Sequence, residues 1–88
     1  VSAVLLTGCT GFVGEHVLEE LVHKKTDCDI YCLVRSSETE LRISSPQIKL
    51  VVGDLGQPQL GVGSEAWQQL CARVSHIIHC GAVVHGLY

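Results

Sequence analysis

The stretch that decides the fold reads Gly8-Cys9-Thr10-Gly11-Phe12-Val13-Gly14, with three glycines in the spacing G-x-x-G-x-x-G. It follows the apolar run at 3–6, which is typical of a strand buried on both faces. Behind it, apolar residues recur at helical spacing and predict an amphipathic helix that ends near Lys25. A glycine pattern between a strand and a helix indicates a phosphate-binding turn, in which Gly14 lets the helix pack closely. The alternative is a glycine-rich turn that binds nothing.

Three further apolar runs, at 30–34, 48–52 and 75–80, predict strands, and a second helix is expected to begin with Ser64 as its cap. Residues 36–47 are polar and serine-rich, and we expect a loop there. Alternation of strands and helices predicts an α/β fold with parallel strands and right-handed crossovers. The chain therefore corresponds to the N-terminal half of a Rossmann-type doubly wound parallel sheet, with strand order 3-2-1-4.

The composition of the chain excludes several classes of protein. With 88 residues, of which 47% are apolar and 17% charged, the chain can form one domain at most and is not disordered. The net charge is -3 and the six basic residues are scattered, which argues against a nucleic-acid or anionic-membrane partner. No apolar run reaches the roughly 20 residues of a membrane span and no signal peptide begins the chain, so we expect a cytoplasmic protein.

The cysteines and histidines do not form a recognisable metal or disulfide pattern. Five cysteines are an odd number without close repeated spacing, so we expect reduced, mostly buried thiols. His76 and His79 fall on opposite faces of a strand and no ligand pair elsewhere completes a set. We predict no metal site.

Polar residues that follow the second and third strands indicate which dinucleotide the site prefers. Arg35 stands where an acidic residue would accept the ribose 2'-hydroxyl of NAD, and its planar fork suits a 2'-phosphate, which favours NADP(H). Ser36 could add a hydroxyl contact, and Asp54 could accept from the adenine amino group. The alternatives are a solvated arginine, a loop serine and a turn-forming aspartate.

Four segments match a known family in order: Val4–Gly14, Tyr31–Arg35, Val52–Leu55 and Ile77–His85. Together they resemble the extended short-chain dehydrogenase/reductases, most closely the thioester reductase branch. That branch includes the reductase domains of nonribosomal peptide and polyketide synthetases, the aminoadipate and carboxylic acid reductases, and the fatty acyl-CoA reductases. The resemblance implies that residues 1–88 are a partial NADP-binding Rossmann domain in which one crossover helix, between Arg35 and the third strand, is missing.

The resemblance also assigns cofactor-binding roles to individual residues. It implies that the pyrophosphate lies along the glycine turn, the 2'-phosphate on Arg35 and the adenine between Asp54 and Leu55. It places three later residues beside the cofactor ribose and the approach to the nicotinamide. With the glycine pattern and Ser36, the predicted cofactor-binding residues are Gly8, Thr10, Gly11, Phe12, Val13, Gly14, Arg35, Ser36, Asp54, Leu55, Gly81, Ala82 and Val84.

The activity that the resemblance implies needs residues that this chain lacks. The parent enzyme would use NADPH to reduce an acyl or peptidyl thioester, held on the phosphopantetheine arm of a carrier domain, to an aldehyde or alcohol. Its Tyr-x-x-x-Lys pair and substrate domain lie downstream of the matched region, and Tyr31 and Tyr88 have no lysine four positions later. We therefore predict no catalytic residue here and an inactive isolated chain. The alternatives are a noncatalytic dinucleotide-binding module and a degenerate remnant.

Overall fold

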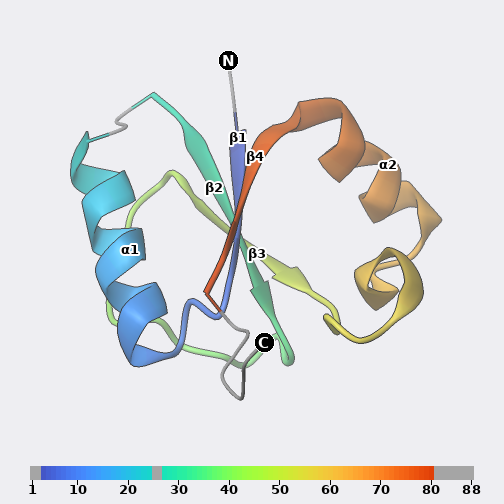
Figure 1. Cartoon of the computed structure of the whole chain (residues 1–88), viewed down its shortest axis with the longest axis horizontal. Coiled ribbons are helices and arrows are strands. Elements are labelled where there is room, and N and C mark those ends of the chain that lie inside the picture. Colours follow the sequence, from blue (N-terminus) through green and yellow to red (C-terminus); the bar gives the residue numbers. More distant parts are fainter. Residues whose placement is uncertain (1–2, 25–26, 81–88) are drawn as a thin grey trace.

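A computed structural model describes residues 3–24 and 27–80. They form a four-stranded parallel sheet in the order β3-β2-β1-β4, which confirms the predicted topology. Figure 1 shows α1 on one face of this sheet and α2 on the other. The elements in chain order are β1 (Ala3–Thr7), α1 (Phe12–Lys24), β2 (Asp29–Val34), β3 (Ile48–Val52), a 3-10 helix η1 (Pro58–Gly61), α2 (Ser64–Arg73) and β4 (Val74–His79).

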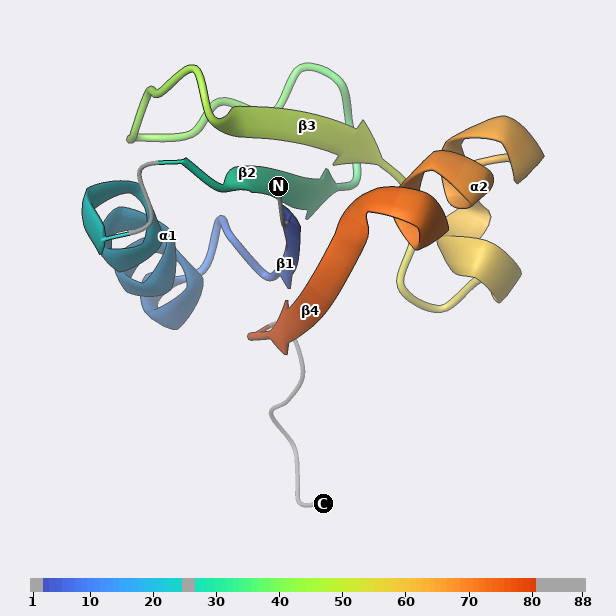
Figure 2. The same cartoon turned by 90° about the horizontal axis from the view of Figure 1, so that it is seen from above.

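The parallel register brings the carboxyl ends of the strands to one edge of the sheet. In the middle of the sheet Leu6 is paired with Cys32 of β2 and with Ile78 of β4. At the end of the strands Val34 is paired with Val52 of β3, so the residues that follow these two strands emerge side by side. Figure 2 shows the strands from above, lying next to one another. Ligands of open α/β sheets bind at this edge.

The core lies between the sheet and α1. All five residues of β1 are buried, as the short apolar run predicted. Leu18 is the buried apolar residue of α1, and it packs on the two central strands. The buried cluster consists of Leu6, Cys9, Leu18, Ile30, Cys32 and Val34.

The segment between β2 and β3 contains no helix, which agrees with the loop predicted there. Two of its side chains, Leu41 and Ile43, pack against the core cluster. They take the position that the missing crossover helix would occupy. Arg42 Nε lies 3.6 Å from Glu15 Oε2 and so links the loop to α1. A pocket of about 240 Å³ remains between this loop and Ile48 and Leu50. The loop therefore covers the sheet face beside α1, but less fully than a helix would.

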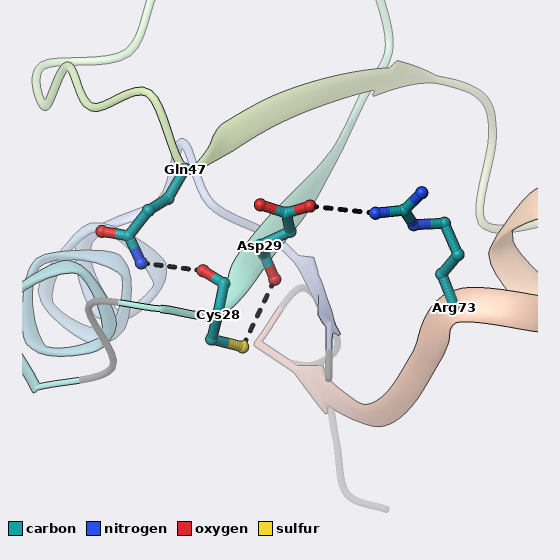
Figure 3. Close-up of polar contacts among 4 residues, drawn as sticks. All are labelled: Cys28, Asp29, Gln47 and Arg73. Atoms are coloured by element: carbon teal, nitrogen blue, oxygen red, sulfur yellow. Dashed lines mark hydrogen bonds and ion pairs between the residues drawn. The ribbon is translucent and has the colours of Figure 1, made fainter. Parts of the chain in front are cut away.

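Polar contacts fix the opposite, amino end of the sheet (Figure 3). Gln47 Nε2 donates to the carbonyl oxygen of Cys28 at 2.7 Å, and Ile30 N–H donates to the carbonyl oxygen of Gln47 at 2.9 Å. Arg73 Nη2, at the end of α2, lies 3.3 Å from Asp29 Oδ2. These contacts set the point at which β2 and β3 begin to pair and join β2 to α2.

One local prediction about α2 is wrong. Ser64 is the first residue of the helix and not its cap. The cap is Gly63, whose φ is 91° and which makes no side-chain capping bond. A glycine tolerates this positive φ without the strain of a side chain, so the chain turns sharply into α2 at Gly63.

Candidate functional site

A pocket of about 270 Å³ opens at the carboxyl ends of β1, β2 and β3. It is bounded on one side by the glycine turn and on the other by residues that follow β2 and β3. This is the position at which doubly wound sheets bind their ligands. The residues that line it are Thr7, Gly8, Thr10, Leu33, Val34, Arg35, Thr39, Gly53 and Leu55.

The glycine turn has the backbone geometry of an anion cradle. Gly8 has φ 76°, and Gly11 N–H donates to its carbonyl oxygen at 3.1 Å, which closes the turn. A Cβ at Gly14 would collide with the Gly8 carbonyl, so only glycine lets α1 pack this closely on the turn. A Cβ at Gly11 would meet only that same oxygen, at 3.5 Å. The turn therefore leaves its outer side free for a ligand.

The first turn of α1 completes this cradle. The first backbone N–H groups of a helix have no partner within the helix, and the helix dipole makes this end partly positive. Thr10, Gly11, Phe12 and Val13 are all exposed, so nothing in the described chain covers this end. The residues present fit a pyrophosphate group of a dinucleotide.

Arg35 and Asp54, predicted as separate cofactor contacts, lie together. Arg35 Nη2 is 3.7 Å from Asp54 Oδ2, and the arginine side chain is 80% exposed. Asp54 is held by its own turn, because its Oδ1 accepts from Gly56 N–H at 2.9 Å and its N–H donates to the Leu60 carbonyl oxygen at 2.7 Å. The ion pair thus joins the ends of β2 and β3 beside the pocket. The pairing of Val34 with Val52 brings the two charged residues together.

Ser36 and Thr39 belong to one tight turn beside the pocket. Ser36 Oγ accepts from Glu38 N–H at 3.1 Å and is not among the pocket residues. Thr39 N–H donates to the Ser36 carbonyl oxygen at 3.1 Å, and this tight turn brings Thr39 to the pocket wall. Sequence reasoning missed Thr39 and Thr7. A serine followed by a turn was the available signal for Thr39.

Thr7 lies where β1 and β4 end side by side, at the topological switch point of the sheet. Its buried Oγ1 is 2.7 Å from His79 Nδ1, and Cys80 N–H donates to its carbonyl oxygen at 3.1 Å. These bonds hold the end of β4 next to the glycine turn. Within residues 3–24 and 27–80, no group of three or more His, Cys, Asp or Glu side chains could hold a metal ion.

The predicted site residues are therefore distributed as follows. Four line the pocket: Gly8, Thr10, Arg35 and Leu55. Gly14 does not line the pocket but packs against the Gly8 carbonyl. Asp54 does not line the pocket either, but it is paired with Arg35, which does. The last three predicted residues, Gly81, Ala82 and Val84, lie outside the described residues.

A second hollow, of about 390 Å³, lies along one side of α1. It is lined by a single helix, mainly by the apolar side chains of Phe12, Val13, Val17 and Leu21. It shares Phe12 and Val13 with the first turn of α1, but no strand end contributes to it and it lacks the converging polar groups of a ligand site. We therefore place the candidate site in the smaller pocket.

Comparisons with known proteins agree with this geometry. The NAD_binding_4 family, described as Male sterility protein, matches residues 6–88. The L-2-aminoadipate reductase large subunit of Penicillium chrysogenum is 35% identical over 102 residues, covering 97% of this chain and 7% of that protein. A linear gramicidin synthase of Brevibacillus parabrevis is 39% identical over 102 residues, covering 98% of this chain and 2% of that protein.

A solved structure supports the same relationship. The terminal R domain from the myxalamid PKS-NRPS biosynthetic pathway is 41% identical and superposes with a TM-score of 0.81. The match covers 100% of this chain and 26% of that domain. The chain thus spans a small part of the curated relatives and about a quarter of the solved domain. No helix among residues 3–24 and 27–80 is long and apolar enough to cross a membrane.

Proposed function

This chain belongs to the NAD_binding_4 family, described as Male sterility protein, and from that membership we propose that it is the cofactor-binding part of an NADPH-dependent thioester reductase. The substrate class would be an acyl or peptidyl thioester on a carrier domain, and the product an aldehyde or alcohol. The observation that carries the proposal is the pocket in which the open glycine turn faces Arg35. Relatedness to an aminoadipate reductase and to a terminal R domain supports the activity of the parent protein.

The glycine turn binds the pyrophosphate in this proposal. The backbone at Thr10, Gly11, Phe12 and Val13 presents N–H groups and the positive end of α1 to the anion. Because Gly11 carries no Cβ, the phosphate oxygens can approach the backbone itself. Gly8 and Gly14 contribute by holding the turn against the helix.

Arg35 binds the 2'-phosphate in this proposal, and the residues around it complete the adenosine end of the site. Its exposed guanidinium can leave Asp54 and offer two parallel N–H donors to a phosphate. Thr39 and Thr10 supply hydroxyl groups in the same pocket, and Ser36 lies one residue from Arg35. Asp54 and Leu55 bracket the adenine from the end of β3. Gly81, Ala82 and Val84 are proposed to lie beside the ribose and nicotinamide.

The chain holds and orients a hydride donor but does not itself complete the reduction. Bound NADPH supplies the hydride. In the family to which the chain is similar, a tyrosine protonates the developing oxyanion and a lysine lowers the pKa of that tyrosine. We propose that residues 1–88 are the partial NADP-binding domain of a cytoplasmic protein, and that the Tyr-Lys pair and substrate domain belong to other parts of it.

The partner of the parent protein is proposed from its relatives. The gramicidin synthase and the R domain of a PKS-NRPS pathway are parts of multidomain synthetases. A carrier domain that presents a phosphopantetheine thioester is therefore the partner that we propose. NADPH-dependent reduction of a carrier-bound thioester by the full-length native protein would support this proposal, and a native protein without that activity would contradict it.

Exchange of Arg35 tests the cofactor assignment. Arg35→Glu should weaken NADPH binding roughly 10- to 100-fold, because charge-assisted bonds worth about 1.5 to 3 kcal/mol are replaced by repulsion. NADH binding should change little, since NADH has no 2'-phosphate. Arg35→Lys is the matched control and should give an intermediate NADPH affinity, because it keeps the charge and loses the fork. Titration calorimetry with both cofactors measures the difference, and equal losses for NADPH and NADH would exclude this role.

A further inference from the structure

Two buried cysteines lie together at the base of the glycine turn. Cys9 belongs to the turn and is 1% exposed, and Cys32 lies in the middle of β2 and is 0% exposed. Cys9 Sγ is 3.9 Å from the carbonyl oxygen of Leu33, the neighbour of Cys32. Both thiols belong to the same buried core cluster, in which Cys9 of the turn packs against β2 at the level of Cys32. Neither thiol is used by the proposed cofactor site.

The two thiols differ in acidity because of this contact. The hydrogen bond with Cys32 lowers the pKa of Cys9 below its ordinary value, and this effect exceeds that of burial, which raises it. The same hydrogen bond, together with burial, raises the pKa of Cys32. A thiolate, and not a thiol, is the nucleophile in sulfur chemistry. Cys9 belongs to the turn, whereas Cys32 lies inside the sheet between β1 and β3, so opening of the turn presents Cys9 to an oxidant first and leaves Cys32 to resolve the product.

We propose that Cys9 and Cys32 form a reversible disulfide that switches off dinucleotide binding at the turn above them. With hydrogen peroxide as oxidant, the Cys9 thiolate attacks one peroxide oxygen, the O–O bond breaks, and a sulfenic acid and hydroxide form. Cys32 then gives up its proton and attacks the Cys9 sulfur, the S–O bond breaks and the S–S bond forms. In total two thiols are oxidised and one hydrogen peroxide is reduced to two water molecules.

Formation of this bond must move the turn and not the sheet. Cys32 is held on both sides, by Leu6 of β1 and Leu50 of β3. A disulfide brings its sulfurs to about 2.05 Å, closer than any hydrogen bond between thiols. Cys9 therefore moves toward β2, and the turn moves with it. Because Gly14 packs directly on Gly8, the displacement also reaches the start of α1.

The functional consequence rests on the proposed function, because the displaced backbone is the proposed pyrophosphate cradle. Its N–H groups lose alignment with the anion, and dinucleotide affinity falls. A bound dinucleotide has the opposite effect on the chemistry. Since both sulfurs are buried, peroxide reaches them only when the turn opens, and a ligand that holds the turn closed should slow their oxidation.

The test is oxidation of the purified protein by hydrogen peroxide, with and without saturating NADP⁺. Peptide mass spectrometry under non-reducing conditions should find a Cys9–Cys32 cross-link that forms more slowly when NADP⁺ is present. After peroxide is removed, the Kd for NADP⁺ should be raised about tenfold or more, the equivalent of one lost charge-assisted bond. Dithiothreitol should restore the original affinity.

Two variants provide the controls. Cys9→Ser removes the reactive sulfur and should make binding insensitive to peroxide. Cys71→Ser is the matched control, because Cys71 is exposed and outside the pair, and it should leave the sensitivity unchanged. If Cys9→Ser does not fold, the cross-link map and the Kd for NADP⁺ of the unsubstituted protein still test the proposed disulfide switch.

Three results overturn the proposal: overoxidation of Cys9 without a cross-link, cross-links that avoid this pair, and a Cys9–Cys32 cross-link that leaves the Kd unchanged. The failure of the proposed function is distinguishable from these. A reduced protein that binds no dinucleotide would overturn that function and the switch together, whereas the cross-link map would still report whether the pair forms.

Discussion

The two halves of this molecule have similar apolar strands but very different burial. In the first half, from β1 to β2, all five residues of β1 are buried, and the whole core cluster belongs to this half. In the second half, from β3 to β4, Leu70 is the one buried residue among those that the structure describes. Ile77 of β4 is 67% exposed, although it is as apolar as its partner in β1, Leu5, which is buried. The difference therefore comes from what covers the strands.

The comparison indicates which half can support a ligand site. The first half is covered by α1 and by the loop side chains Leu41 and Ile43. The second half has α2 beside it, but a pocket of about 330 Å³ remains between α2 and strands β2 and β3. The glycine turn and Arg35 belong to the well-covered half. The cofactor cradle is thus built on the part of the chain that supplies its own core.

The largest effect is expected where the first half is most tightly packed. Gly14→Ala places a Cβ against the Gly8 carbonyl, so the turn and α1 must separate. We expect the free energy of unfolding to fall by about 4 kcal/mol or more, the exceptional range for one substitution. Gly11→Ala is the matched control, because its Cβ lies at an ordinary contact distance of 3.5 Å and should leave folding intact. Chemical denaturation measures both, and equal stabilities would contradict the packing described.

A pair of apolar truncations compares the two halves directly. Leu18→Ala removes a buried side chain from the core and should cost about 3 kcal/mol of stability. Ile77→Ala removes an exposed side chain from β4 and should cost less than about 1 kcal/mol. Thermal or chemical denaturation of both variants gives the two values. Similar losses would show that the second half is as well packed as the first.

Asp54 joins the two halves at the ligand edge, and its exchange decides between three roles. As a competitor of the 2'-phosphate for Arg35, Asp54 should weaken NADPH binding, so Asp54→Asn should tighten it about threefold to tenfold and leave NADH nearly unchanged. As an adenine acceptor, it should matter equally to both cofactors, and Asp54→Ala should weaken both. As a support for Arg35, its loss should weaken NADPH alone. We expect the first result for Asn. For Ala we expect weaker binding of both cofactors, with the smaller loss for NADPH, because Ala also frees Arg35.

The smallest effect is expected at the other end of the sheet. Arg73 joins α2 to β2 through Asp29, at 3.3 Å, but its side chain is 57% exposed (Figure 3). Exposed ion pairs contribute little, so Arg73→Ala should cost about 0.5 kcal/mol. A loss above about 2 kcal/mol would mean that this contact, and not packing, holds α2 in place.

Much of the fold could be predicted because its signals are local. The helical period after Phe12 predicted α1 to within one residue of its observed end at Lys24, and the apolar run at 48–52 matched β3. The glycine spacing predicted the turn, because Gly8 has a positive φ and Gly14 leaves no room for a Cβ. Strand order followed from the alternation of strands and helices and the fixed hand of the crossovers.

The remaining features depend on contacts between distant parts of the chain. The Arg35–Asp54 pair needs the register of β2 against β3, and Thr39 reaches the pocket through a turn that begins at Ser36. The exposure of Ile77 could not be predicted either, because an apolar residue indicates a preference for burial but not the presence of a covering surface. Ser64 was a reasonable cap by residue type, but a positive φ at Gly63 starts the helix instead.

The central claim, a site built for NADPH on the glycine turn and Arg35, is tested most directly by titrating the reduced protein with NADPH and NADH under identical conditions. We predict saturable binding of both, with NADPH at least about tenfold tighter, because charge-assisted contacts to the 2'-phosphate contribute about 1.5 kcal/mol or more. Equal affinities would remove Arg35 from the phosphate site, and the absence of binding to either dinucleotide would contradict the proposed function.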